Sequence, residues 1–342
     1  MSKTTIRDVA KFAGVGVGTV SRVLNNSPAV SESTRLKVQA AIKALNFSPN
    51  LAARRLSQGK SMAIGVIVPF FTNPSVVRRL QGVVSVLSVS EYDLILFDIE
   101  KIDQRDMSLR TIPQRKLADG LLLISLTPSD MDVEQFALAN IPTVLVDAYH
   151  PALSRVRVDN VEGGYLATRH LIDLGHRQIG YISDYLDDPF NSPVRDRFTG
   201  YKRALAEAGI EFCSEYHLQG EHGRTQARQM AHDLLTLPDP PSAIFAYSDT
   251  QAIGVIEAAK ALGIRIPEHL SVVGFDNIEA AEYLHITTVR QALFESGVKG
   301  AKLLLEIMAT PSSPPQELVL PTELVIRNTT APYAGTTATA VT

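Results

Sequence analysis

Residues 6–25 read IRDVAKFAGVGVGTVSRVLN, and this stretch predicts two short helices joined by a glycine turn. At its start, Thr5 and Asp8 have the spacing of a capping box, in which a hydroxyl and a carboxylate satisfy each other's backbone amides. Gly14 is expected to end the first helix, and the second is expected to begin at Val17. Two helices joined in this way fit a helix-turn-helix, whose second helix enters the major groove of DNA. An ordinary small helical domain with a charged face fits the same pattern.

The second expected helix has two different sides. At about 100° per residue, Val20, Val23 and Leu24 share one side, which is suited to packing against the first helix. Arg22 lies on the other side, among polar and small residues. An arginine there can form a bidentate pair with guanine, and Val17 can contact a thymine methyl group.

Charge is distributed unevenly along the 342 residues. The whole chain holds 33 basic and 36 acidic residues, a formal net charge of −3, which by itself argues against a nucleic-acid ligand. Residues 1–60 hold ten basic and two acidic residues, a net charge of +8, whereas the other 282 residues carry −11. Such a chain has a basic module, attracted to polyphosphate, on an acidic body.

After residue 60, apolar runs of strand length alternate with amphipathic helical stretches. This alternation predicts a mostly parallel sheet covered on both faces, and roughly 270 residues suit two lobes better than one. The single cysteine excludes an intramolecular disulfide framework, and no apolar run approaches the ~20 residues that cross a bilayer. The expected strands are 63–68, 94–98, 121–125, 144–147, 179–183, 243–247 and 272–275, and the expected helices include 163–174, 197–208, 224–235 and 250–262.

The N-terminal residues resemble the lactose-repressor (LacI) family of bacterial transcription regulators. The matching residues are Ile6-Arg7-Asp8-Val9-Ala10, Ala13-Gly14-Val15, Thr19-Val20-Ser21-Arg22-Val23-Leu24-Asn25, Val30-Ser31, Thr34-Arg35, Val38, Ala41-Ile42, Leu45, Pro49-Asn50 and Ala53-Arg54. The resemblance implies an all-α helix-turn-helix headpiece over residues 1–48 and a hinge helix over residues 49–60. It also implies DNA contacts from Thr5, Val17, Gly18, Thr19, Ser21, Arg22, Asn25, Asn50, Ala53, Arg54 and Leu56.

Two features of this resemblance bear on how DNA is read. The family's variable base-reading positions fall on Val17 and Gly18, and Gly18 has no side chain, so direct readout is expected to be sparse. Leu56 matches a leucine that opens the central base step from the minor groove. The alternative for Leu56 is that it packs against the domain that follows. Gly16 replaces a serine of the family, which costs the recognition helix a few tenths of a kcal/mol of capping.

The remaining chain resembles the same family's effector domain, which shares the fold of periplasmic sugar-binding proteins. The matching motifs are Asp159-Asn160 with Gly163-Gly164, Leu174-Gly175-His176-Arg177, Arg197 with Gly200-Tyr201, Asp249 with Ala252-Ile253-Gly254, and Val273-Gly274-Phe275-Asp276. They imply a two-lobed α/β core over residues 61–330, with parallel sheets and a small molecule bound between the lobes. Residues 331–342 show no apolar repeat and are expected to form an unstructured tail.

A sugar or nucleoside needs carboxylates and amides that accept from its hydroxyls, a guanidinium that donates, and faces that stack. On this basis we expect effector contacts from Phe71, Asn73, Ser125, Asp147, Asp159, Arg197, Tyr247, Asp249 and Asp276. For each aspartate, the alternative is a solvated residue at a strand end that caps the next helix. His176 and His222 lack the spacing of metal ligands and are expected to be structural or solvated.

The sequence thus predicts a repressor that binds pseudo-palindromic double-stranded operator DNA as a cytoplasmic homodimer, without a membrane partner. Its effector is expected to be a sugar, polyol or nucleoside, with no cofactor and no metal. An enzyme is not expected, since the chain lacks a Walker A lysine motif, a G-x-S-x-G elbow and an H-E-x-x-H pair. The alternative is a cytosolic solute-binding protein without DNA function, which the +8 module disfavours.

Overall fold

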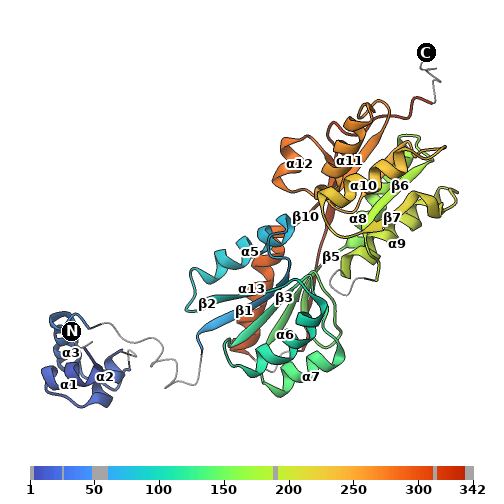
Figure 1. Cartoon of the computed structure of the whole chain (residues 1–342). Helices are drawn as coiled ribbons and strands as arrows, with labels where there is room; N and C mark the ends of the chain where they lie inside the picture. The colour runs from blue at the N-terminus through green and yellow to red at the C-terminus, as the bar shows by residue number, and fades with distance from the viewer. Residues whose placement is uncertain (1–3, 25–26, 48–60, 188–191, 311–313, 336–342) are drawn as a thin grey trace. The chain divides into compact units, whose positions relative to one another are not determined.

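The computed structural model describes residues 4–24, 27–47, 61–187, 192–310 and 314–335 of the chain. It separates into two compact units, Met1–Ser61 and Met62–Thr342, which we describe one at a time. Figure 1 shows the helices and strands of both units. No helix in the described ranges is long and apolar enough to cross a bilayer.

The N-terminal unit contains three described helices, α1 (Ile6–Ala13), α2 (Val17–Leu24) and α3 (Glu32–Ala44). The expected capping box is present at the start of α1, and Gly14 ends that helix with a left-handed φ of 66°. A small core holds the three helices together, and its buried members are Val9, Ala10, Val20, Val23, Val38 and Ala41.

The second unit consists of two lobes, and the one that contains its first strand, which we call lobe 1, is built on a six-stranded sheet. Its strand order is β11-β5-β4-β3-β1-β2, and every neighbouring pair is parallel. Helices α5 and α13 cover one face, while α6 and α7 cover the other. The strands are β1 (Ala63–Pro69), β2 (Asp93–Ile99), β3 (Gly120–Ile124), β4 (Thr143–Val146), β5 (Ser154–Val158) and β11 (Glu317–Leu320); the helices are α5 (Pro74–Leu87), α6 (Ile102–Gln114), α7 (Asp130–Leu138) and α13 (Leu293–Ala309).

The other lobe, which we call lobe 2, has a sheet of the same size in the order β12-β10-β9-β8-β6-β7. Helices α8 and α9 cover one face, and α10 and α11 cover the other. The strands are β6 (Ile179–Asp184), β7 (His217–Gly220), β8 (Ala243–Ala246), β9 (Ser271–Asp276), β10 (Thr287–Gln291) and β12 (Thr322–Val325); the helices are α8 (Asn160–Asp173), α9 (Ser192–Glu207), α10 (Arg224–Leu235), α11 (Asp249–Ala261) and the short α12 (Glu279–Tyr283), with a 3₁₀ turn, η1 (Ser214–Tyr216).

The chain passes between the lobes at residues 158–160, 291–293 and 320–322 within the described ranges. Because β5 and β11 belong to lobe 1 while α8 and β12 belong to lobe 2, these short segments form the hinge. Asn160 and Gln291 therefore lie where one lobe gives way to the other.

The expected two-lobed α/β core with parallel sheets is confirmed, with one exception inside lobe 2. Strand β12 runs antiparallel to β10, because the chain enters it directly from the hinge. The sequence patterns also missed β5, β7, β10, β11 and β12. These strands are only four or five residues long, and all of them except β11 mix polar with apolar residues.

Residues 331–335, expected to belong to an unstructured tail, contact lobe 2 instead. Ala331 exchanges hydrogen bonds with Ser271, and the Tyr333 amide donates to the Leu174 carbonyl. The last residues, 336–342, lie outside the described part of the chain.

Candidate functional site

The N-terminal unit presents one face of α2 to solvent. Val17, Gly18 and Arg22 are exposed, whereas Val20 and Val23 are buried, so the two sides of the helix divide as its periodicity predicts. Of the other candidate DNA contacts, Thr5 is an exposed helix cap and Thr19 and Ser21 are half-buried. Asn25, Asn50, Ala53, Arg54 and Leu56 lie outside the described residues.

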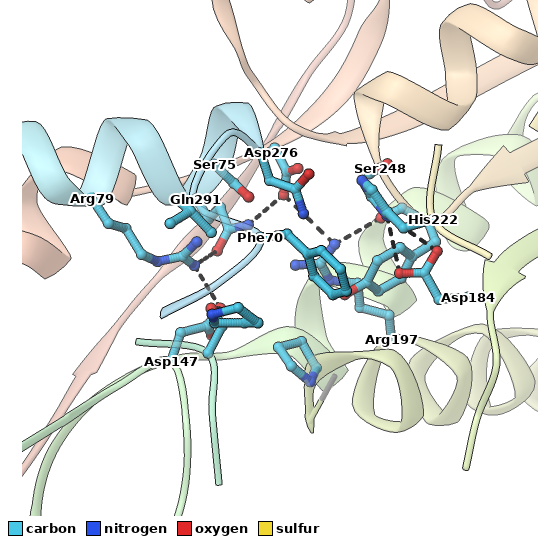
Figure 2. Close-up of a pocket in the computed structure, with 16 residues that line it drawn as sticks. Phe70, Ser75, Arg79, Asp147, Asp184, Arg197, His222, Ser248, Asp276 and Gln291 are labelled. Carbon is cyan, nitrogen blue, oxygen red and sulfur yellow. Dashed lines mark hydrogen bonds and ion pairs between the residues drawn. The ribbon is translucent and has the colours of Figure 1, made fainter. Parts of the chain in front are cut away.

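The second unit contains a cavity between its lobes, at the carboxyl ends of the parallel strands (Figure 2). Four lining residues at or just after strand ends have left-handed φ angles: Phe70, Ser125, Asp147 and Asp276. Such a backbone costs roughly 1–3 kcal/mol per residue and is typical of ligand sites. The cavity is lined by Pro69, Phe70, Asn73, Ser75, Val76, Arg79, Ser125, Asp147, Asp184, Pro193, Arg197, His222, Tyr247, Ser248, Asp276 and Gln291.

Lobe 1 contributes a buried ion pair to this cavity. Arg79 of α5 is 1% exposed, and its Nη2 donates to Asp147 Oδ2 at 2.6 Å. The Ser125 hydroxyl lies 3.4 Å from the same oxygen. A buried charge is tolerated only when it is paired and hydrogen-bonded. Here Arg79 and Asp147 neutralise each other and share a hydrogen bond.

Lobe 2 contributes a second buried pair, which is held differently. Arg197 of α9 lies 3.6 Å from Asp276 Oδ1, at the end of β9. Its guanidinium carbon is 3.6 Å from the ring centroid of Phe275 and 4.4 Å from that of Tyr247, so cation–π contacts hold it on both aromatic rings. Burial raises the pKa of Asp276, and the charges of Arg197 and Arg79 oppose this rise.

Two hinge amides join the pairs into a closed ring of hydrogen bonds and ion pairs. Asn160 donates to Asp147 at 3.1 Å and accepts from Arg197 Nε at 2.9 Å. Gln291 accepts from Arg79 at 2.8 Å and donates to Asp276 at 2.5 Å. Figure 2 shows the Arg79 and Gln291 side of this ring. The six side chains therefore connect lobe 1, the hinge and lobe 2 through charged and amide groups.

Two sections of the chain match known families. Residues 5–50 match the family described as bacterial regulatory proteins, lacI family, and residues 168–330 match the periplasmic binding protein-like domain. The HTH-type transcriptional repressor PurR of Vibrio vulnificus is 35% identical over 334 residues, which cover 95% of this chain and 98% of that protein. The chain belongs to the lacI family of bacterial regulatory proteins.

Solved structures agree with this assignment. The Lac repressor dimer bound to operator and the anti-inducer ONPF matches with a TM-score of 0.85 at 26% identity, covering 96% of this chain and 100% of that one. The complex of the transcriptional regulator CelR with cellobiose matches with a TM-score of 0.71 at 30% identity, with the same coverage. This lacI-family chain is thus a transcriptional repressor with an N-terminal DNA-binding domain and an effector-binding domain.

The cavity of this lacI-family protein brings together six of the nine effector contacts expected from the sequence. These six are Asn73, Ser125, Asp147, Arg197, Tyr247 and Asp276. The other three, Phe71, Asp159 and Asp249, do not line it.

Local structure explains why these three side chains lie elsewhere. Phe71 is 41% exposed, and its left-handed neighbour Phe70 occupies the cavity wall instead. Asp159 caps α8 by accepting from the Glu162 amide. Asp249 is fully buried, where it accepts from Thr288 and from the Ile278 amide. Burial raises the pKa of Asp249, and the charge of Asp276 adds to the rise.

Several residues that line the cavity were not predicted from the sequence. Arg79 and Gln291 are 212 positions apart, and neither belongs to a recognisable motif. His222, expected to be structural or solvated, lines the cavity and contacts Asp184. Asp184 ends an apolar strand, as Asp276 does, so its position after such a run was the one local signal available.

Proposed function

We propose that this repressor binds a pseudo-palindromic duplex operator as a homodimer, and that an uncharged polyhydroxylated effector controls its operator affinity. The effector class includes sugars, polyols and nucleosides, and the proposed site is the cavity between the lobes. We infer further that the protein acts in the cytoplasm, where its DNA lies, and has neither a cofactor nor an enzymatic activity.

The observation that carries the effector class is the closed ring of paired charges. Arg79 faces Asp147 and Arg197 faces Asp276, so neither guanidinium has an uncompensated positive charge for an anionic ligand. The ring still offers hydrogen bonds, because an ionised carboxylate has about four lone-pair sites, more than the ring partners of Asp147 and Asp276 occupy. Donors and acceptors without net charge suit the hydroxyls of a neutral ligand. The complex of CelR with cellobiose is consistent with such a ligand.

We assign the effector contacts to the lining residues Asn73, Ser125, Asp147, Arg197, Tyr247 and Asp276. Their carboxylates are engaged in ion pairs and amide hydrogen bonds, so ligand binding accounts for them without acid–base catalysis. Phe71, Asp159 and Asp249 remain weaker candidates, since each has a local structural role or an exposed position.

The homodimer is supported by the apolar surface of lobe 1. Val77 and Val84 of α5, Leu96 of β2 and Phe294 of α13 are all at least one-third exposed. Exposed apolar residues gathered on neighbouring elements are typical of protein interfaces. The similar Lac repressor structure is a dimer on its operator, and two recognition helices need two half-sites about one DNA turn apart.

Thermal unfolding with matched neutral and charged ligands tests the effector class. The pairs are D-ribose with ribose 5-phosphate and D-glucose with gluconate, and cellobiose is added as a larger neutral sugar. A neutral ligand at a hundred times its Kd should stabilise the native state by about 2.7 kcal/mol and raise the melting temperature, while its charged counterpart should not. A larger shift with the phosphorylated or carboxylated member would overturn the proposal.

Operator binding is tested by fluorescence anisotropy on a selected operator and on random duplex. Affinity for both should fall steeply as salt rises, because basic residues displace counterions. Leu56→Ala should weaken binding to the operator far more than to random DNA, since wedge insertion belongs to the specific complex. Equal losses on the two duplexes would assign Leu56 to packing instead.

A further inference from the structure

The lobe 2 wall of the cavity holds an imidazole, a carboxylate and an amide in series, and the ring described above does not include them. His222 follows β7, Asp184 ends β6, and Gln251 lies in the first turn of α11. Asp184 is 3% exposed and Gln251 is fully buried. The side chain of His222 is 25% exposed and faces the cavity, where Figure 2 shows it against Asp184.

The contacts in this series fix the orientation of the imidazole. Gln251 Nε2 donates to Asp184 Oδ1 at 2.8 Å. The two carboxylate oxygens lie 3.2 and 3.0 Å from His222 Nδ1. Because an ionised carboxylate only accepts, Nδ1 carries the proton, and Nε2 is the ring nitrogen left to meet a ligand.

Charges around the imidazole favour its protonated form. Burial alone would lower the pKa of His222, and Arg197 of α9 acts in the same direction. The hydrogen bond and charge of Asp184 on β6, together with the charge of Asp276 on β9, outweigh them and raise the pKa above its ordinary value. A protonated His222 also balances Asp184, so this third pair leaves the cavity wall neutral, like the first two.

We propose that His222 determines effector specificity by donating its Nε2 hydrogen to an oxygen of the ligand, with Asp184 and Gln251 as positioning residues. This inference rests on the proposed function, since it concerns the same cavity and the same class of neutral ligand. It adds that the end of the ligand nearest His222 carries an acceptor oxygen, such as a hydroxyl, ring or carbonyl oxygen. It also makes affinity dependent on pH, because the deprotonated Nε2 accepts instead of donating.

The test measures ligand affinity by calorimetry at pH 6.0, 7.0, 8.0 and 9.0. The probes are D-ribose, cellobiose and guanosine, and the variants are studied with whichever of the three binds the wild type most tightly. The wild type should lose affinity as the pH rises past the raised pKa of His222. His222→Gln should bind about tenfold more weakly at pH 6.0, the loss expected for one hydrogen bond from a charged donor, and its affinity should not change across the series.

Two further variants separate this role from a general effect on folding. Asp184→Asn removes the carboxylate that favours the charged imidazole, so the pH profile should move to lower pH while the protein still binds. His232→Gln, on the exposed outer helix α10, should match the wild type at every pH. Thermal unfolding confirms that each variant is folded.

The outcomes distinguish the two proposals. If the wild type binds a probe and His222→Gln retains both the affinity and the pH profile, the role of His222 is overturned and the effector class stands. If the wild type binds none of the three probes but binds their phosphorylated counterparts, the proposed effector class fails, and the inference fails with it.

Discussion

The two lobes place an arginine in the cavity in the same way but hold it by different forces. Arg79 lies on α5 and Arg197 on α9, and each helix is approached closely by a glycine of the helix packed against it. Gly297 of α13 meets the Arg79 carbonyl, and Gly164 of α8 meets the Arg197 carbonyl. In lobe 1 the guanidinium then contacts a carboxylate at 2.6 Å, whereas in lobe 2 the ion pair is 3.6 Å long and two aromatic rings flank the cation.

In both lobes the same close packing of two helices determines the position of the arginine. The side chains around the guanidinium then determine which interactions stabilise it. The lobe 1 core is largely aliphatic. The lobe 2 core beside Arg197 holds a cluster of rings, in which Tyr181 stacks on Tyr201 with centroids 5.1 Å apart. Lobe 1 therefore depends on charge pairing, and lobe 2 depends more on ring contacts.

The largest expected effect comes from removing the lobe 1 cation. Arg79→Met leaves Asp147 buried without its cation and should cost about 3–5 kcal/mol of unfolding free energy. Adding Asp147→Asn to this variant should recover most of the loss, since no uncompensated charge remains and asparagine tolerates the left-handed φ of this position. Arg197→Met should cost less, because its ion pair with Asp276 is 3.6 Å long, against 2.6 Å for Arg79 and Asp147, and each aspartate keeps one hinge-amide donor. Urea unfolding of the four proteins measures these costs, and equal losses from the two arginines would remove the distinction between the lobes.

The half-buried His217 of lobe 2 should make the protein less stable in acid, and lobe 1 has no histidine with a lowered pKa among its described residues. Burial, with a smaller contribution from the charge of Lys202, lowers the pKa of His217 to about 4. The unfolded chain has a histidine pKa near 6.5, so it binds the proton first, and stability falls as the pH drops from about 6.5 to 4. The shift corresponds to about 3 kcal/mol for this group. His217→Gln should reduce the difference in urea stability between pH 7 and pH 4.5, and an unchanged difference would contradict the assignment. The exposed His232→Gln is the control.

Many of the strands, and some of the cavity residues that follow them, were predictable from the sequence because they have recognisable local patterns. β1, β3 and β9 are continuous apolar runs, and Asp276 follows such a run directly, so both the strand and the cavity residue could be found. β10 has no such apolar run, since Thr287–Gln291 combines hydroxyl, charged and amide side chains with a single valine. Its sequence therefore did not predict a strand. Its last residue, Gln291, completes the ring of hydrogen bonds and ion pairs at the hinge. This role could not be predicted locally, because it requires a hydrogen bond from Arg79, which is remote in sequence.

Asp249 shows that a local pattern can also predict a cavity residue wrongly. Like Asp276, it comes soon after an apolar strand, and this position alone does not show which way the side chain points. In the structure Asp249 lies in the first turn of α11, and its carboxylate turns to Thr288 and the Ile278 amide, away from the cavity. The direction of a side chain at a strand end depends on the path of the following loop and on partners from other strands.

The smallest expected effect concerns the glycines that bring the helices together. A Cβ at Gly297 or Gly164 would lie far inside van der Waals contact with the arginine carbonyl of the neighbouring helix, so that helix must move. Gly297→Ala and Gly164→Ala should each cost about 1–2 kcal/mol, because overpacking costs roughly 1–3 kcal/mol and alanine returns up to about 1 kcal/mol of helix propensity. Gly18→Ala, on α2 of the N-terminal unit, shows the propensity gain without overpacking, since open space surrounds that helical position. Thermal unfolding of the three variants compares them directly. Similar losses in the two lobes would show that the close packing of the two helices is under the same constraint in both, whereas a neutral alanine in one lobe would show that its arginine is positioned by side-chain contacts alone.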